Sequence, residues 1–151
     1  MTALECDASG FLRLCDVSRL TERELPLAMR RIGSRARDNA QSEHEYVNRT
    51  SRLTNSIAFM TGRDGNTFWA QIGSNVEYAP YVEYGTGRRG SSLYVARDGS
   101  AYETEGLTFR GDWPGMGPHP YLRPALYDHK ATYIAMINDA VKRSIKQGGS
   151  A

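Results

Sequence analysis

Residues 78–86 read Tyr78-Ala79-Pro80-Tyr81-Val82-Glu83-Tyr84-Gly85-Thr86, and the rest of the chain is organised around them. Pro80 suits the first position of a helix, where the missing N–H of proline costs nothing. Gly85 can adopt the positive φ that ends a helix. We therefore expect one or two helical turns with a crowded aromatic surface, built to pack against another surface and carrying no catalytic arrangement.

The composition is that of an ordinary soluble globular protein. With 151 residues, 40% of them hydrophobic and 24% charged, the chain is long enough for one domain with a single core. A net charge of +2 is too small to indicate a nucleic-acid partner by itself. The chain has no apolar run near the roughly 20 residues that cross a bilayer, and its start lacks the features of a signal peptide. We therefore expect no membrane partner and synthesis in a cytoplasm.

Few side chains are placed for chemistry. Cys6 and Cys15 are expected to be unpaired thiols with a structural or neutral role, because a cytosol is reducing. Their spacing is not that of a zinc finger. The histidines are His44, His119 and His129, and neither a nucleophile elbow nor a paired metal-ligand motif accompanies them. We expect no enzyme activity, no metal and no cofactor. Half of a zinc site and a small enzyme are the alternatives.

Glu83 is the carboxylate within the aromatic stretch. A buried carboxylate there would be a candidate acid or base, but no second acid lies at a defined spacing from it. The favoured interpretation is that Glu83 meets an arginine, either Arg88, Arg123 or one from a neighbouring subunit. We expect His119, between two prolines, to belong to a rigid turn and His129 to be a satisfied core histidine.

The segment before the stretch predicts a helix and then a hairpin. Residues 1–17 are interpreted as an arm in which the run Phe11–Val17 is a short strand or an extended segment. Ser18 can cap a short turn, and Pro26 suits the start of a longer helix. Apolar positions at helical spacing are Met29, Ile32, Ala36 and Ala40. Arginines occupy the other faces at Arg30, Arg31, Arg35 and Arg37, which is typical of a solvated face; contact with nucleic acid or a partner is the alternative.

The hairpin is predicted from two β-rich runs, residues 57–61 and 67–73, joined by a longer loop at 62–66. The polar segment 41–55 before it fits a loop, with a turn of helix around 52–56. Phe68, Ala70 and Ile72 share one face of the second run. Trp69 on the other face suggests that this face is also covered, by the chain itself or by a neighbour.

After the stretch we expect a projecting hairpin loop over residues 87–112. Its strands are 92–96 and 101–104, with a further short strand at 107–109. The run Gly87–Ser92 lacks the glycine spacing and the Lys-Ser/Thr of a phosphate-binding loop, so a basic hairpin base is favoured. The final element is an amphipathic helix that ends near Lys146. Its apolar positions are Leu122, Ala125, Leu126, Tyr133, Ile137, Ala140, Val141 and Ile145.

Two segments together resemble a bacteriophage family. Residues 78–86 resemble a signature of the form YA-x-Y-V-E-x-G-T, and residues 118–126 resemble an aromatic-Leu-Arg-Pro-Ala-Leu run that opens the C-terminal helix. The polar stretch 50–57 also resembles the family's approach to its first hairpin. The family comprises head–tail connector or tail-completion proteins of long-tailed phages, similar to minor tail protein Z. Tyr121 stands where the family often has Phe, and residues 1–17 lie outside the resemblance.

The resemblance implies an α+β fold: a mainly antiparallel sheet with a long N-terminal helix and a C-terminal helix packed on it, plus the projecting loop 87–112. The expected organisation is an arm at 1–17, one connector-like domain at 18–146 and a flexible tail at 147–151. The resemblance also implies a structural virion protein without enzyme activity. We expect it in the virion tail or neck, and in the host cytoplasm during assembly.

The implied role is a homo-oligomeric ring, expected to be hexameric, at the top of the tail. Expected partners are the connector or adaptor, the tail terminator or the tail tube, with non-specific contact to packaged DNA. A tail-terminator role and a DNA-binding accessory protein that uses the arginine-rich first helix are the alternatives. Candidate packing or subunit-interface residues are Trp69, Tyr78, Tyr81, Val82, Glu83, Tyr84, Tyr94, Tyr121, Leu122 and Arg123. Candidate lumen- or DNA-facing residues are Arg31, Arg35, Arg88 and Arg89.

Overall fold

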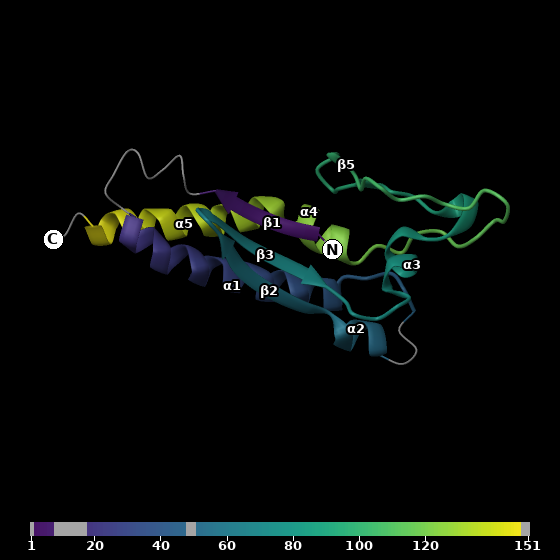
Figure 1. Cartoon of the computed structure of the whole chain (residues 1–151), viewed down its shortest axis with the longest axis horizontal. Coiled ribbons are helices and arrows are strands. Elements are labelled where there is room, and N and C mark those ends of the chain that lie inside the picture. Colours follow the sequence, from purple (N-terminus) through teal and green to yellow (C-terminus); the bar gives the residue numbers. More distant parts are fainter. Residues whose placement is uncertain (1, 8–17, 48–50, 149–151) are drawn as a thin grey trace.

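The computed structural model describes residues 2–7, 18–47 and 51–148, which form an α+β fold (Figure 1). Strands β1 (Thr2–Asp7), β3 (Thr67–Gly73) and β2 (Ala58–Asp64) form an antiparallel sheet in that order. A separate antiparallel hairpin joins β4 (Leu93–Val95) to β5 (Ala101–Glu103). The expected fold class is therefore confirmed. Within the described residues, no helix combines the length and the apolarity that a membrane crossing requires.

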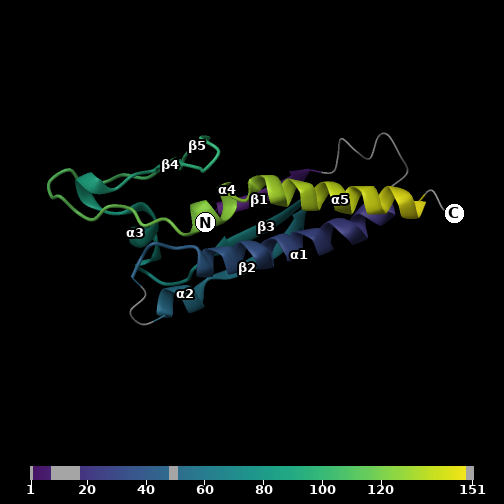
Figure 2. The same ribbon diagram turned by 180° about the vertical axis from the view of Figure 1, so that it is seen from behind.

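Two long helices cover one face of the sheet. Helix α1 (Ser18–Ser42) packs on β2 and β3, and α5 (Lys130–Gly148) runs beside α1. Figure 1 has the sheet in front, and Figure 2 shows both helices from behind. The core lies between these layers, so the long N-terminal and C-terminal helices pack on the sheet as expected.

Helix α1 begins at Ser18, earlier than predicted. Pro26 therefore lies inside the helix rather than at its first position. A proline inside a helix removes one hydrogen bond and crowds the preceding turn. Leu25 and Ala28, on either side of Pro26, are both buried, so packing against the body holds the helix together across this point. The predicted apolar stripe of Met29, Ile32, Ala36 and Ala40 is buried throughout.

Gly33 and Phe59 set how closely α1 approaches the sheet. The ring of Phe59 lies directly against Gly33, where a Cβ would collide with it. The guanidinium of Arg37 lies 5.4 Å from the centre of the same ring. A glycine in a helix interior costs about 1 kcal/mol relative to alanine, and the close contact with the sheet accounts for its use here.

The β2–β3 hairpin is tighter than predicted. Strand β2 continues to Asp64, so only Gly65 and Asn66 form the turn, and Gly65 has the positive φ of 57° that such turns require. Gly62 pairs with Trp69, and the indole lies over the glycine, so the chain itself covers part of Trp69. Phe68, Ala70 and Ile72 are buried on the helix-covered side, as predicted.

Residues 2–7 form β1, which pairs along the free side of β3. Part of the predicted N-terminal arm is therefore a strand of the main sheet. The run Phe11–Val17, where a strand or extended segment was expected, lies outside the described residues, and so does Cys15. The predicted helical turn near residue 52 is confirmed as α2 (Arg52–Ser56).

The predicted single C-terminal helix is wrong, because it is divided into α4 (Leu122–Tyr127) and α5 (Lys130–Gly148). Asp128 and His129 lie at the break, where their side chains bond to the hairpin and to Glu43, the residue that follows α1. Most of the apolar stripe as far as Ala140 is buried, but Ile137 and Val141 are half-buried, and Ser144 is buried where Ile145 is exposed. The Ser144 hydroxyl donates to the Ala140 carbonyl, which satisfies it inside the helix.

The hairpin strands predicted within 92–104 are confirmed as β4 and β5. The further strand predicted at 107–109 is wrong, since the structure describes those residues without a strand. These residues belong to the longer stretch 85–118, which lies at the end of the molecule opposite the C-terminal end of α5 (Figure 1).

Candidate functional site

The two sequence signatures meet at a buried carboxylate. Helix α3 (Ala79–Tyr84) starts with Ala79 and Pro80 and ends at Gly85, whose φ is 74°, as predicted. From its last turn, Glu83 reaches the first residues of α4. Its Oε2 accepts the backbone N–H groups of Tyr121 (2.7 Å) and Leu122 (2.9 Å). Glu83 therefore caps the N-terminal end of α4, where free N–H groups favour an acceptor with negative charge.

Arg123 completes this junction. Its Nε donates to Glu83 Oε1 at 2.8 Å, and its backbone N–H donates to the same oxygen at 3.1 Å. Its Nη2 donates to the Glu83 carbonyl at 2.6 Å and its Nη1 to the Ser92 carbonyl at 3.3 Å. Both side chains are about 2% exposed. The arginine partner expected for Glu83 is therefore Arg123, whereas Arg88 is exposed.

Two tyrosines flank the buried guanidinium. The Arg123 guanidinium carbon lies 4.5 Å from the ring centre of Tyr84 and 5.6 Å from that of Tyr94. Planar guanidinium groups interact favourably with aromatic faces, most strongly away from water. The junction of Glu83, Arg123 and these rings therefore binds α3, α4 and the β4–β5 hairpin into one unit.

This arrangement is structural in its chemistry. Each Glu83 oxygen accepts two hydrogen bonds, and the Arg123 guanidinium is paired at Nε, Nη1 and Nη2. A general base needs access to a proton on a substrate, and a carboxylate held by these donors offers none. His119 contributes through its backbone, whose N–H donates to the Val82 carbonyl at 2.8 Å, in keeping with a rigid turn.

The predicted interface residues separate into inner and outer groups. Tyr121 and Leu122 are buried, and Val82 and Tyr84 are half-buried. Tyr81 is 58% exposed and Tyr78 is 39% exposed, although both belong to the aromatic stretch. Trp69 is half-buried on the face of the sheet away from the helices. The stretch thus holds the subunit together with Glu83 and Tyr84 and offers Tyr78 and Tyr81 to the outside.

Tyr121 carries an unsatisfied polar group. Its ring is fully buried and meets Tyr46 edge to face, with ring centres 5.5 Å apart. Within the described residues its hydroxyl has no hydrogen-bond partner. Burial, with a further contribution from the charge of Glu83, raises the pKa of Tyr121 well above its usual value. Tyr121 also lines a cavity of about 100 Å³ beside Glu83 and Ser74.

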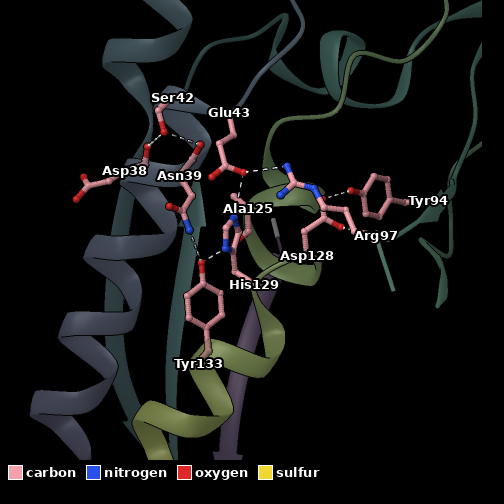
Figure 3. Close-up of polar contacts among 10 residues, drawn as sticks. All are labelled: Asp38, Asn39, Ser42, Glu43, Tyr94, Arg97, Ala125, Asp128, His129 and Tyr133. Carbon is pink, nitrogen blue, oxygen red and sulfur yellow. Dashed lines mark hydrogen bonds and ion pairs between the residues drawn. The ribbon is translucent and has the colours of Figure 1, made fainter. Parts of the chain in front are cut away.

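A second polar cluster holds the tip of the hairpin to the body (Figure 3). The Asp128 carboxylate accepts the Tyr94 hydroxyl and the Arg97 backbone N–H, both at 2.9 Å. The Arg97 guanidinium lies 3.3 Å from Glu43 and 3.4 Å from Asp128. Glu43 also meets His129 Nε2 at 3.0 Å. We call Glu43, Tyr94, Arg97, Asp128 and His129 the hairpin-tip cluster.

Two groups of the cluster have shifted acidity. The hydrogen bond from His129, with the charges of His129 and Arg97, lowers the pKa of Glu43. Burial and the hydrogen bond to Asp128 raise the pKa of Tyr94. Within the cluster, His129 is half-buried and bonded to Glu43, so it is satisfied as predicted but does not lie in the core. The cluster connects the residue that follows α1, the hairpin and the α4–α5 break.

The predicted basic residues do not form one surface. Arg31 and Arg35 are exposed on α1. Arg88 and Arg89 are exposed on a short 3₁₀ helix, η1 (Gly87–Arg89). Figure 1 places this part of the chain at the loop end of the molecule, away from the middle of α1.

Sequence reasoning missed a backbone crossing near these arginines. Thr86 and Met116 exchange backbone hydrogen bonds of 2.8 and 3.1 Å. Gly87 and Gly115 both have positive φ, and their backbones approach so closely that a Cβ on either would collide with the other segment. The signal in the sequence was the glycine spacing of both segments. It indicated turns and gave no sign that the turns touch each other.

Comparison with known proteins adds a family. Residues 13–85 match the family model described as "Bacteriophage HK97-gp10, putative tail-component". The match spans a little under half of the 151 residues and ends at Gly85, within the aromatic stretch. No curated protein and no solved structure shows significant similarity to the chain. The resemblance to a bacteriophage tail family, first inferred from the two signatures, is confirmed.

Proposed function

We propose that this chain, which matches a family of bacteriophage tail components over residues 13–85, is a tail-completion or head–tail joining subunit. In this role, copies of the chain assemble as a ring, expected to be hexameric, at the top of the tail. The ring connects the tail to the head connector. Its partners are other tail and neck proteins, and its place is in the virion after assembly in the host cytoplasm.

The observation that carries this proposal is the Glu83–Arg123 junction beneath exposed tyrosines. The junction fixes α3 rigidly on α4, yet leaves Tyr78 and Tyr81 facing outward. Rings need two different patches on each subunit. Exposed Ile134 and Ile145 on α5 supply an apolar surface on a separate element. Rigid aromatic side chains are enriched at protein–protein interfaces, so the outward tyrosines are the first candidate patch.

We also propose that the chain is not an enzyme. The buried carboxylate of Glu83 is occupied by four hydrogen bonds at the junction. Among the residues that the structure describes, no three His, Cys, Asp or Glu side chains gather as metal ligands would. These observations support a structural role, in which the residues of the site serve to pack the fold.

A gene deletion tests the role of the chain in the virion. A phage that lacks this gene should accumulate filled heads and unjoined or abnormal tails, which electron microscopy would count. Normal infectious particles in its absence would contradict the proposal. Light scattering and negative-stain imaging of the purified protein, with and without purified tails as a template, would measure whether a ring forms.

Substituting the aromatic stretch separates folding from assembly. Tyr81→Ala removes an exposed ring and should leave the unfolding midpoint nearly unchanged while weakening ring formation. Tyr84→Ala removes a ring that covers Arg123 and should lower stability as well. Sedimentation velocity and thermal unfolding of both variants would measure this. If both stay folded and assemble as the wild type does, the aromatic stretch has no role in the ring.

The alternative of a DNA-binding accessory protein has one observation in its favour. Arg30, Arg31 and Arg35 are exposed along α1. Contacts of arginine with phosphate are independent of sequence and weaken steeply with salt. Salt-dependent binding of duplex DNA by the monomer, lost when these arginines are neutralised, would favour this alternative over ring assembly.

A further inference from the structure

We propose that residues 85–90 and 113–118 form a preformed docking surface for an acidic, partly apolar patch on another protein of the tail or neck. This inference rests on the proposed function. We call these two segments the distal loop pair. They lie at the loop end of the molecule, and the first of them contains η1 (Figure 1). The proposal gives Arg88 and Arg89 a protein partner in place of DNA.

The distal loop pair is held in one conformation by backbone hydrogen bonds. Thr86 and Met116 bond in both directions, and the Thr86 hydroxyl accepts the Met116 N–H as well, at 3.0 Å. The N–H groups of Arg88 and Arg89 donate to the carbonyls of Trp113 and Pro114, at 3.1 and 3.2 Å. A surface that is already ordered loses less entropy when it binds.

Glycines make this crossing possible. Gly85, Gly87 and Gly115 all have positive φ and lie in backbone contact with the opposite segment. Gly111, in the neighbouring loop, has open space around it and no such φ. The close approach is therefore specific to the distal loop pair and is not a general property of this glycine-rich region.

The ordered backbone presents large side chains to solvent. Trp113 is 46% exposed and Met116 is 40% exposed, and Arg88 and Arg89, which precede the hairpin in sequence, are exposed as well. Tryptophan and arginine are the residue types most enriched among those that dominate binding energy at protein interfaces. A rigid loop that exposes these side chains has the features of an interface rather than of a solvated turn.

Charge and apolar area together select the partner. The distal loop pair contains two arginines and no acidic residue, and within the described residues neither guanidinium forms an ion pair. The phosphates of duplex DNA would complement the arginines but offer nothing that buries Trp113 and Met116. An acidic protein patch with an apolar centre complements all four side chains.

The test uses tails and DNA-filled heads purified separately from a phage that lacks this gene. Fluorescently labelled protein is titrated against each, and binding is measured by co-sedimentation. The variants are Arg88→Glu/Arg89→Glu and Trp113→Ala. Their controls are Arg52→Glu/Lys142→Glu, which makes the same change of charge at exposed positions elsewhere, and Leu107→Ala, which removes an exposed apolar side chain outside the distal loop pair.

We expect the wild type to bind tails or heads, both test variants to bind at least about tenfold more weakly, and both controls to bind as the wild type. Ring size and unfolding temperature should be the same for all. Variants that bind as tightly as the wild type would overturn the inference and leave the proposed function intact. So would loss of ring formation, which would make the surface a contact between copies.

Binding to a duplex oligonucleotide provides the third comparison. If the arginine variant loses only salt-sensitive binding to the duplex and still binds tails and heads, the surface recognises nucleic acid and the inference is wrong. A wild type that binds neither tails nor heads would instead overturn the proposed function, and the inference with it.

Discussion

Two ionic groupings hold the loop end of this protein to its body, and they differ in almost every physical respect. At the junction of Glu83 and Arg123, both charges are buried and every strong donor meets an acceptor. In the hairpin-tip cluster, the Arg97 side chain is 69% exposed and shares its charge between Glu43 and Asp128. Removing one partner should therefore lower the free energy of unfolding much more at the junction than at an exposed pair of the cluster.

The difference shows which polar contacts in this fold are indispensable. A buried pair binds firmly because each partner would be costly to leave alone, whereas water replaces either partner of an exposed pair. The junction should behave as part of the core. The exposed pairs of the hairpin-tip cluster should respond to salt, and Glu43 to pH. Asp128, whose side chain is only 3% exposed, should be screened less by salt.

The largest effect is expected for Glu83→Ala. It leaves the Arg123 charge buried and removes the acceptor of the Tyr121 and Leu122 N–H groups. Breaking a buried pair by removing one partner typically costs about 3–5 kcal/mol, which urea unfolding would measure. The double variant Glu83→Leu/Arg123→Met should recover much of the loss, because no isolated charge remains. If Glu83→Ala lowered the free energy of unfolding by less than about 1 kcal/mol, the junction would be no more important for stability than an exposed ion pair.

Asp128→Ala should have an intermediate effect, because Asp128 is the buried member of the hairpin-tip cluster. The Tyr94 hydroxyl and the Arg97 backbone N–H both lose their acceptor. Leaving such groups unsatisfied costs about 1–3 kcal/mol. Asp128→Asn keeps one oxygen and should fall between the wild type and the alanine variant in the same unfolding experiment. Equal stability of all three would contradict the assignment.

Two buried tyrosines make a matched pair with opposite expectations. Tyr121→Phe removes a hydroxyl without a hydrogen-bond partner and should raise stability by about 1 kcal/mol. Tyr133→Phe removes a hydroxyl that donates to the Ala125 carbonyl at 2.6 Å and accepts from Asn39, and should lower stability by about 1 kcal/mol. Thermal unfolding of both variants measures the difference. A loss of stability in both variants would show that the Tyr121 hydroxyl is satisfied in solution, and a gain in both would contradict the assigned bond of Tyr133.

The smallest effect is expected for Glu43→Gln, and it should depend on pH. Folding lowers the pKa of Glu43, so the ionised carboxylate adds to the free energy of unfolding above its unfolded pKa of about 4.5. This contribution is lost as the pH falls through the lower pKa of the folded state. The variant should be less stable than the wild type near pH 7 by a few tenths of a kcal/mol. The gap should close in acid and shrink in high salt. A stability difference between wild type and variant that widens in acid would show that the pKa of Glu43 is not lowered.

The parts of the fold that could be predicted from the sequence are those whose geometry depends on residues within a single element. The α1 stripe, the β2–β3 hairpin and the limits of α3 follow from the local spacing of apolar, proline and glycine residues. The break at Asp128–His129 could not be predicted, since it depends on bonds to the hairpin and to Glu43, which lie far away in sequence. The helix start at Ser18 was missed because packing of Leu25 and Ala28 overrides the local preference of Pro26.

The candidate site divides in the same way. A partner for Glu83 was predictable, because a carboxylate among aromatic residues requires one, and Arg123 was among the candidates. Which tyrosines face inward was not predictable, since Tyr81 and Tyr84 differ only in their position around one short helix. The contact of Gly87 with Gly115 was hidden for a similar reason, because turn residues do not indicate which distant turn they meet.

The stretch between Gly90 and Trp113 is closed at its base twice, by the Thr86–Met116 bonds and, further in, by Glu83 with Arg123. Doubling the length of a closed loop adds only about 0.6 kcal/mol of entropy, so this stretch can accept inserted sequence without a change in the body beneath it. Gly106 lies outside the hairpin strands with open space around it. A small epitope inserted there would let antibody labelling locate the protein in an intact particle.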